Sequence, residues 1–165
     1  MEYSCAPALP EEKMIKRKLL REFLLRTVTW LKQNPEKLNM DIEDGRISSS
    51  LAMSLSHRHH YTLSIWITDW SGDEITLLSL IELWLRRHEP DIFATEKARE
   101  TGFRYCIQEQ DSTHLILNIR LRLTERTIVK IENGTLIAIS KDEIPLPAPE
   151  QDILSAYLDE GDNGQ

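Results

Sequence analysis

The residues best suited to chemistry lie in two stretches, His57-Arg58-His59-His60 and the turn that holds Asp69 and Asp73. Side chains two apart in a strand share a face, so His57 and His59 could bind one metal ion. An arginine separates them and no cysteine or carboxylate is near in sequence, so a polar segment that titrates near neutral pH is the better interpretation. Asp69 and Asp73 could act as general acid and base, but turn and helix-capping roles explain both.

Other common catalytic patterns are missing from the sequence, which has no glycine-rich phosphate loop, nucleophile elbow or CxxC pair. Cys5 and Cys106 lie far apart and lack the spacing of a metal site, so we expect both thiols to be reduced. We predict that the protein is not an enzyme and has no catalytic residue, cofactor or metal ion. A hydrolase that uses Asp69 or the histidines is the alternative with least support.

The turn connects a predicted strand, over residues 61–68, to a predicted helix of unusual composition. Ser71 and Glu74 have the spacing of a capping box ahead of an apolar run. The polar positions of the helix before Arg86 form one narrow strip, whereas a surface helix normally has a wider polar face. We therefore predict that a second copy of the chain covers this helix. The residues predicted at this interface are Leu78, Glu82 and Leu85.

The chain before the central strand is predicted to hold one helix and a hairpin. Residues 11–32 place apolar side chains on one wide helical face, and Asn34-Pro35 ends that helix. A strand over 38–42 leads to Asp44-Gly45, which predicts a hairpin because both turn residues favour positive φ. The return strand would run on to the histidine-rich segment 57–60, which would join it to the central strand.

The chain after the apolar helix is predicted to be mostly strand. Thr95 can cap a short helix over 96–100, and alternation predicts strands over 103–109 and from residue 115 onward. Asn133-Gly134 predicts a late hairpin, which would project from the body as an arm. The fold class is α+β, with two main helices packed on one face of a largely antiparallel sheet.

Further candidate interface residues lie on the long strand. Arg120 and Arg122 alternate with apolar residues and so point to the outer face of the sheet, which suggests a surface that faces a partner. Glu125-Arg126 could be an ion pair on the surface of one chain or an ion pair between subunits.

Charged residues are distributed unevenly along the chain, with a basic segment near the N-terminus and an acidic segment at the C-terminus. Residues 142–165 hold seven acids and no Lys or Arg, so the preceding residues have 20 acids and 20 bases. Residues 11–32 carry seven bases and three acids, and this basic helix and the acidic tail could attract each other within one chain or between neighbours. Simple solvation of both is the alternative.

We predict an extension over 1–10, one domain over 11–143, and a tail over 144–165 with a proline-rich linker and a short helix.

No apolar run is long enough to cross a bilayer and no signal peptide is evident, so we expect a soluble protein made in the cytoplasm, without a membrane partner. Binding of nucleic acid through the basic first helix is the alternative function. The neutral body and the acidic tail argue against it, because their summed field does not attract phosphates.

The run from Tyr61 to Asp73, the string Leu123-Thr124-Glu125-Arg126-Thr127 and several shorter pieces together resemble the tail completion protein R family of contractile-tailed phages. The likeness covers roughly residues 20–130. Its most specific pieces are the run from Tyr61 to Asp73 and the string Leu123-Thr124-Glu125-Arg126-Thr127. Shorter matching pieces are Ser54-Leu55-Ser56, Trp84-Leu85, Pro90-Asp91-Ile92, Gly102-Phe103 and Ile128-Val129.

The resemblance implies a structural protein of the virion tail with a fold like that of tail terminators. Such proteins cap the finished tail tube, usually as hexameric rings, and let it join the head. The implied partners are other copies of the chain, the tail tube, the sheath and the head connector. A prophage or a tail-like bacteriocin cluster would encode the chain, assembly would take place in the host cytoplasm, and no enzyme activity or cofactor is implied.

Overall fold

The computed structural model of the chain describes residues 14–51 and 55–141. The predicted N-terminal extension and the predicted proline-rich linker and tail helix lie outside these residues. The elements, in chain order, are α1 (Ile15–Thr27), α2 (Thr29–Gln33), η1 (Pro35–Lys37), β1 (Leu38–Ser48), β2 (His57–Trp70), α3 (Glu74–His88), η2 (Pro90–Phe93), α4 (Glu96–Gly102), β3 (Phe103–Glu109), β4 (Leu115–Glu132) and β5 (Thr135–Lys141).

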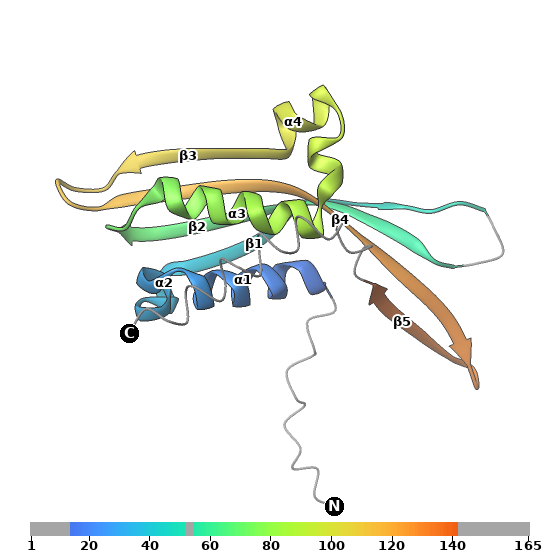
Figure 1. The fold of residues 1–165 in the computed structure, drawn as a ribbon. Helices are drawn as coiled ribbons and strands as arrows, with labels where there is room; N and C mark the ends of the chain where they lie inside the picture. Colours follow the sequence, from blue (N-terminus) through green and yellow to red (C-terminus); the bar gives the residue numbers. More distant parts are fainter. Residues whose placement is uncertain (1–13, 52–54, 142–165) are drawn as a thin grey trace, which may run out of the picture.

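The strands form one antiparallel sheet in the order β1-β2-β4-β3. Strand β4 is long enough to have two neighbours in succession on the edge away from β2. Its first part pairs with β3, and its last part, from Arg126, pairs with β5. The β4–β5 hairpin therefore extends beyond the body of the molecule, as Figure 1 shows. The predicted α+β class and the largely antiparallel sheet are confirmed.

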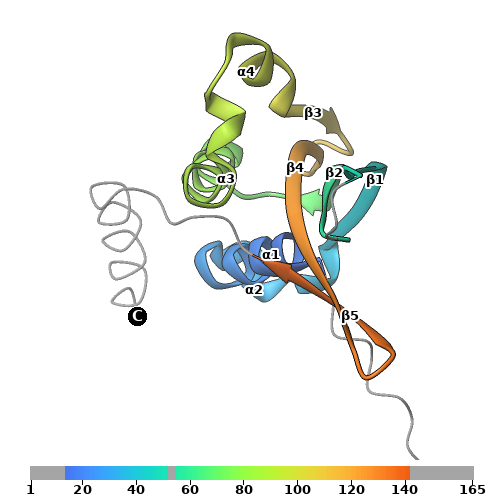
Figure 2. The same ribbon diagram turned by 90° about the vertical axis from the view of Figure 1, so that its right-hand side faces the viewer.

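Helices α1, α2 and α3 lie on one side of the sheet, and the opposite face is not covered by a helix among the described residues (Figure 2). The alternation predicted for the central strands holds. Leu63, Ile65 and Ile67 of β2 are fully buried, and so are the inward residues of β4 from Leu117 to Leu123. These side chains and the inner faces of α1 and α3 form the core of the domain.

The first helix is interrupted, which corrects the prediction of one continuous helix to residue 32. Val28 is extended, with φ −102° and ψ 104°, and separates α1 from α2. Thr27, Val28 and Thr29 are consecutive β-branched residues, which lose side-chain freedom in a helix. The break lets the ring of Trp30 meet that of Trp70 edge-on, at 4.9 Å between centroids. The predicted end at Asn34-Pro35 is confirmed, since α2 ends at Gln33.

The predicted hairpin at Asp44-Gly45 is wrong, because these residues form a bulge within β1. Asp44 has a φ of 52°, and the register with β2 shifts between Glu43 and Arg46. Two residues of β1 thus stand opposite Tyr61, which is the geometry of a bulge. The strand continues to Ser48, so two strands rather than three precede α3, and the histidine-rich segment belongs to β2 itself.

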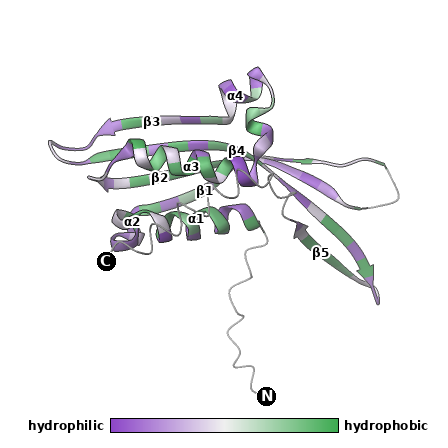
Figure 3. Cartoon of the chain, in the orientation of Figure 1, coloured by the Kyte–Doolittle hydropathy of each residue, from purple (hydrophilic) through white to green (hydrophobic). Residues whose placement is uncertain are grey.

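The late hairpin was predicted correctly. Asn133 and Gly134 both have positive φ, 52° and 75°, as a type I′ turn requires. We call residues 128–139 the arm. Hydrophobic residues occur along both of its strands, as Figure 3 shows.

Candidate assembly surfaces

Helix α3 begins at a cap that differs from the predicted one. Asp73 is the N-cap, and its carboxylate accepts from the amides of Ile75, at 3.0 Å, and Thr76, at 3.3 Å. The Ser71 hydroxyl instead accepts from the Trp30 indole N–H at 2.9 Å. The predicted Ser71–Glu74 capping box is therefore wrong. The Thr76 bonds, followed by that of Ile75, lower the pKa of Asp73.

Most of the apolar surface of α3 is buried within the monomer. Leu77, Leu80, Ile81, Trp84 and Leu85 all belong to the core. Leu85 is 0% exposed, so its predicted place at an interface is wrong. The sheet and α1 cover more of the helix than its narrow polar strip suggested. Leu78 and Glu82 are half-buried, and both line a groove beside α3.

This groove lies between α3 on one side and η2, α4 and β3 on the other, with a volume of about 420 Å³. Its lining is mainly apolar, and Ile75 and Tyr105 within it are 66% and 58% exposed. The apolar lining residues are Ile75, Leu78, Ile92, Phe93, Phe103 and Tyr105. An apolar groove of this kind is typical of a surface that binds another protein segment. Leu78 and Glu82 were predicted from the sequence, but the residues of the opposite wall were not, because alternation does not show which strand lies beside a helix.

The arm has no second layer on either face among the described residues. Ile131 is 64% exposed, and its cross-strand neighbour Leu136 is 60% exposed. Ile139, on the other face, is 46% exposed. A two-stranded hairpin is marginally stable alone, and exposed apolar strands at a sheet edge favour pairing with another chain.

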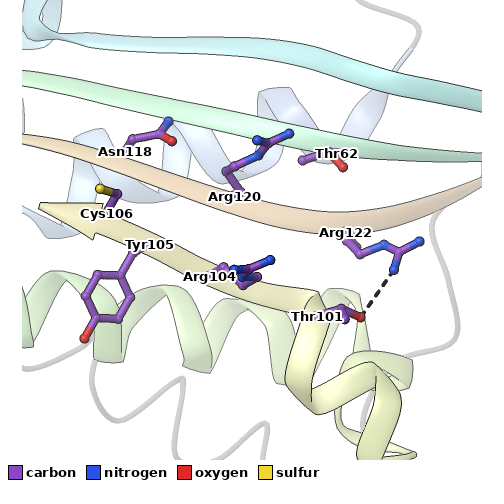
Figure 4. Close-up of a pocket in the computed structure, with 8 residues that line it drawn as sticks. All are labelled: Thr62, Thr101, Arg104, Tyr105, Cys106, Asn118, Arg120 and Arg122. Atoms are coloured by element: carbon purple, nitrogen blue, oxygen red, sulfur yellow. Dashed lines mark hydrogen bonds between the residues drawn. The ribbon is translucent and has the colours of Figure 1, made fainter.

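The outer face of the sheet brings Arg120 and Arg122 together with Arg104, as Figure 4 shows. These side chains line an open hollow of about 520 Å³. Arg120 donates to Glu43 at 2.9 Å, and Arg122 donates to Thr101 at 3.2 Å. Arg126 lies farther along the same face of β4 and is exposed. Arg104 could not be predicted from the sequence, because its place opposite Arg120 depends on the register of β3 with β4.

Glu125 is buried and so cannot form the predicted ion pair between subunits. Its carboxylate accepts from the backbone N–H of Lys16 at 2.7 Å, in the first turn of α1. The Lys16 ammonium, itself buried, lies 2.6 Å from Glu89, which also accepts from the amide and hydroxyl of Thr124. Burial raises the pKa of Glu89 and Glu125, partly opposed by their bonds to Lys16. The network joins α1, the end of α3 and the point where β4 leaves the body.

The histidines share a face, as predicted, with 3.0 Å between the Nε2 atoms of His57 and His59. Burial, followed by its histidine neighbours, lowers the pKa of His59. No group of three or more His, Cys, Asp or Glu with metal-binding geometry occurs among the described residues. Asp69 lies within β2, where the register with β4 shifts between Ile67 and Trp70. It has a φ of 54° and pairs with Lys37 at 2.5 Å.

The basic face of α1, on which the nucleic-acid alternative depended, is partly used inside the fold. Lys16 is buried, and Arg21 donates to the carbonyl of Leu38 at 3.0 Å. None of the helices in the described part of the chain is both long and apolar enough to span a membrane.

The described surfaces, an apolar groove and an apolar arm, are those of a protein that acts by binding other proteins, and the comparisons with known proteins agree with this class. Residues 14–145 match the model of the P2 phage tail completion protein R (GpR) family, and the chain belongs to that family. It is similar to tail completion protein R of Escherichia phage P2, with 36% identity over 145 residues, which are 88% of this chain and 94% of that protein. No solved structure matches the chain. The resemblance found in the sequence is confirmed, and with it a role in phage tail assembly.

Proposed function

We propose that copies of this chain form a closed ring that caps the tail tube and prepares the tail for head joining. The resemblance to tail terminators supports six copies. The ring would assemble in the host cytoplasm, with one face on the last layer of the tube and the other toward the head connector. The observation that carries the proposal is the arm, on which Ile131, Leu136 and Ile139 are exposed in the described monomer.

The arm and the α3 groove supply two different surfaces for contact between copies. The arm extends away from the body, and no arm residue lines the groove of its own chain. If the arm of one copy binds the groove of the next, the contact is heterologous, and such contacts form a ring when the rotation between copies closes. Burial of apolar side chains would stabilise this contact by about 25 cal/mol per Å².

The molar mass in solution tests ring formation. The wild-type protein is expected at a multiple of its 19.2 kDa monomer mass. Ile131→Asp with Leu136→Asp puts two charges on one face of the arm and is expected to give monomers with unchanged circular dichroism. Thr135→Asp is the matched control, because Thr135 is an exposed polar residue of the same hairpin. Multimers that survive the double change would refute the arm contact.

Electron microscopy tests the capping role. Wild-type protein added to tails that lack it is expected to form rings at one tail end and to restore a uniform tail length. The arm variant is expected to do neither. Tails of uniform length without the protein would contradict a capping role.

A further inference from the structure

Arginines are concentrated on the outer face of the sheet, beyond the hollow already described. Register and alternation place six of them there, and we call this set the arginine face. The residues are Arg46, Arg58, Arg104, Arg120, Arg122 and Arg126. Two pairs, Arg104 with Arg120 and Arg58 with Arg126, stand directly opposite each other on neighbouring strands. Like charges in such positions destabilise a sheet unless anions neutralise them.

The described part of this face has few acids. The outward positions of β2 and β3, and those of β4 as far as Arg126, hold none. The acids that are present lie on or beside β1, where Glu43 and Asp44 contact Arg120. His60 lies among the arginines, and burial followed by Arg46, Arg58 and Arg122 lowers its pKa, as expected in a positive field. The face thus has the charge to bind an anionic segment.

The chain itself supplies such a segment. Residues 142–165 hold seven acids and no Lys or Arg. Strand β5 ends at Lys141, which is in register with Arg126 of the arginine face. The acidic residues therefore begin at one end of this face. From Arg126 to Arg120 along β4 is about 20 Å, whereas the 24 residues after Lys141 can span roughly 80 Å.

We propose that residues 142–165 bind the arginine face of their own chain through carboxylate–guanidinium contacts. A segment tethered at the edge of its binding surface has an effective concentration in the millimolar range, which favours its own chain over a second copy. Arginine is well suited to this partner because its planar group binds carboxylates in a bidentate manner. The binding neutralises the sheet surface and excludes other polyanions from it. It does not depend on ring formation.

Cys106 provides a probe on this face, since it is exposed and lines the hollow with Arg104 and Arg120. A nitroxide label on Cys106 of the full chain, with Cys5→Ser, is expected to broaden the amide resonances of residues 142–162 at low salt. The broadening should fall in 0.5 M NaCl, where charges are screened within about 4 Å. Arg104→Gln with Arg122→Gln should reduce it at least twofold, and Arg87→Gln, an exposed arginine of α3, should not.

The outcomes that overturn the proposal are distinct. Unbroadened tail resonances at low salt would mean that the segment does not reach the face. When labelled chains are mixed with isotope-enriched unlabelled chains, the tail resonances of the unlabelled chains are expected to stay sharp, and broadening there as strong as in the labelled chains would assign the face to a second copy. A third measurement uses duplex DNA: replacing the seven acids with Asn or Gln should raise the affinity at least tenfold. Equal affinity of both proteins would overturn the proposed shielding.

Discussion

Gly72 shows how one residue in the central turn controls packing. A Cβ at this position would lie 2.8 Å from the ring of Trp70, which is buried and meets Trp30 edge-on. A contact as short as this forces the ring to move, and overpacking of this kind costs about 1–3 kcal/mol. We expect Gly72→Ala to lower the free energy of unfolding in urea by that amount. Gly45→Ala is the control, because nothing lies within 4 Å of a Cβ there. Equal losses in both variants would contradict this account.

The buried network at the base of the arm predicts a pH dependence. Burial raises the pKa of Glu125 above its ordinary value, so the folded state binds a proton that the unfolded state releases. The free energy of unfolding therefore falls as the pH rises from the ordinary glutamate pKa to the raised one, with a slope of at most about 1.4 kcal/mol per pH unit. Outside this window Glu125 contributes no slope.

Glu125→Gln removes this titration but leaves an oxygen that can accept from the Lys16 amide. The stability of the variant relative to wild type is expected to increase as the pH rises through the window. Urea unfolding at intervals from pH 4 to 8 measures the difference in free energy of unfolding between the variant and wild type. The contributions of the other titrating groups largely cancel in this difference. A difference that stays constant over this range would show that Glu125 does not titrate there.

At the scale of elements, the N-terminus of α3 depends on Asp73 rather than Ser71. Removal of an N-cap side chain costs about 0.5–2 kcal/mol, because it leaves amides of the first turn without a partner. We expect Asp73→Ala to lose stability in this range in urea unfolding. Ser71→Ala should lose less, since it removes only an exposed bond from the Trp30 indole. The opposite ranking would restore Ser71 as the residue that stabilises the start of the helix.

Local patterns were sufficient for the elements whose geometry is local. Helix α3, the Thr95 cap of α4 and the turn at Asn133-Gly134 all follow from residues close in sequence. At Asp44-Gly45 the same reasoning failed, because a bulge can also require positive φ at the first residue. What separates a bulge from a hairpin is the strand opposite it, and that is a long-range pairing.

The candidate surfaces show the same difference between what local patterns predict and what depends on long-range pairing. Alternation showed that Arg120 and Arg122 face outward, but the inclusion of Arg104 required the register of β3 with β4. Leu78 and Leu85 looked equivalent in the sequence because both lie on the apolar part of one helix. The structure separates them by what packs over each, which helical periodicity does not indicate.

At the scale of the whole molecule, substitutions at Leu85 and Leu78 separate a loss of the fold from a loss of assembly. Leu85 belongs to the core, so Leu85→Asp places a carboxylate among apolar side chains without a partner. Such burial costs several kcal/mol, enough to unfold a domain of ordinary stability. We expect the Leu85→Asp protein to lose its cooperative thermal transition. Leu78 lines the groove and is half-buried, so Leu78→Asp should keep a cooperative transition with a smaller loss of stability.

The two variants should differ as clearly in mass. If the groove receives the arm of a neighbour, Leu78→Asp gives folded monomers by light scattering, whereas Leu85→Asp gives unfolded or aggregated chains. Ser79→Asp is the matched control, since Ser79 lies on the same rim but is polar and exposed, and it should keep most of the assembly. A folded Leu78→Asp protein that still forms multimers of wild-type mass would exclude the groove as the contact, because the charge would then lie outside the interface. The arm would in that case bind another surface of its neighbour.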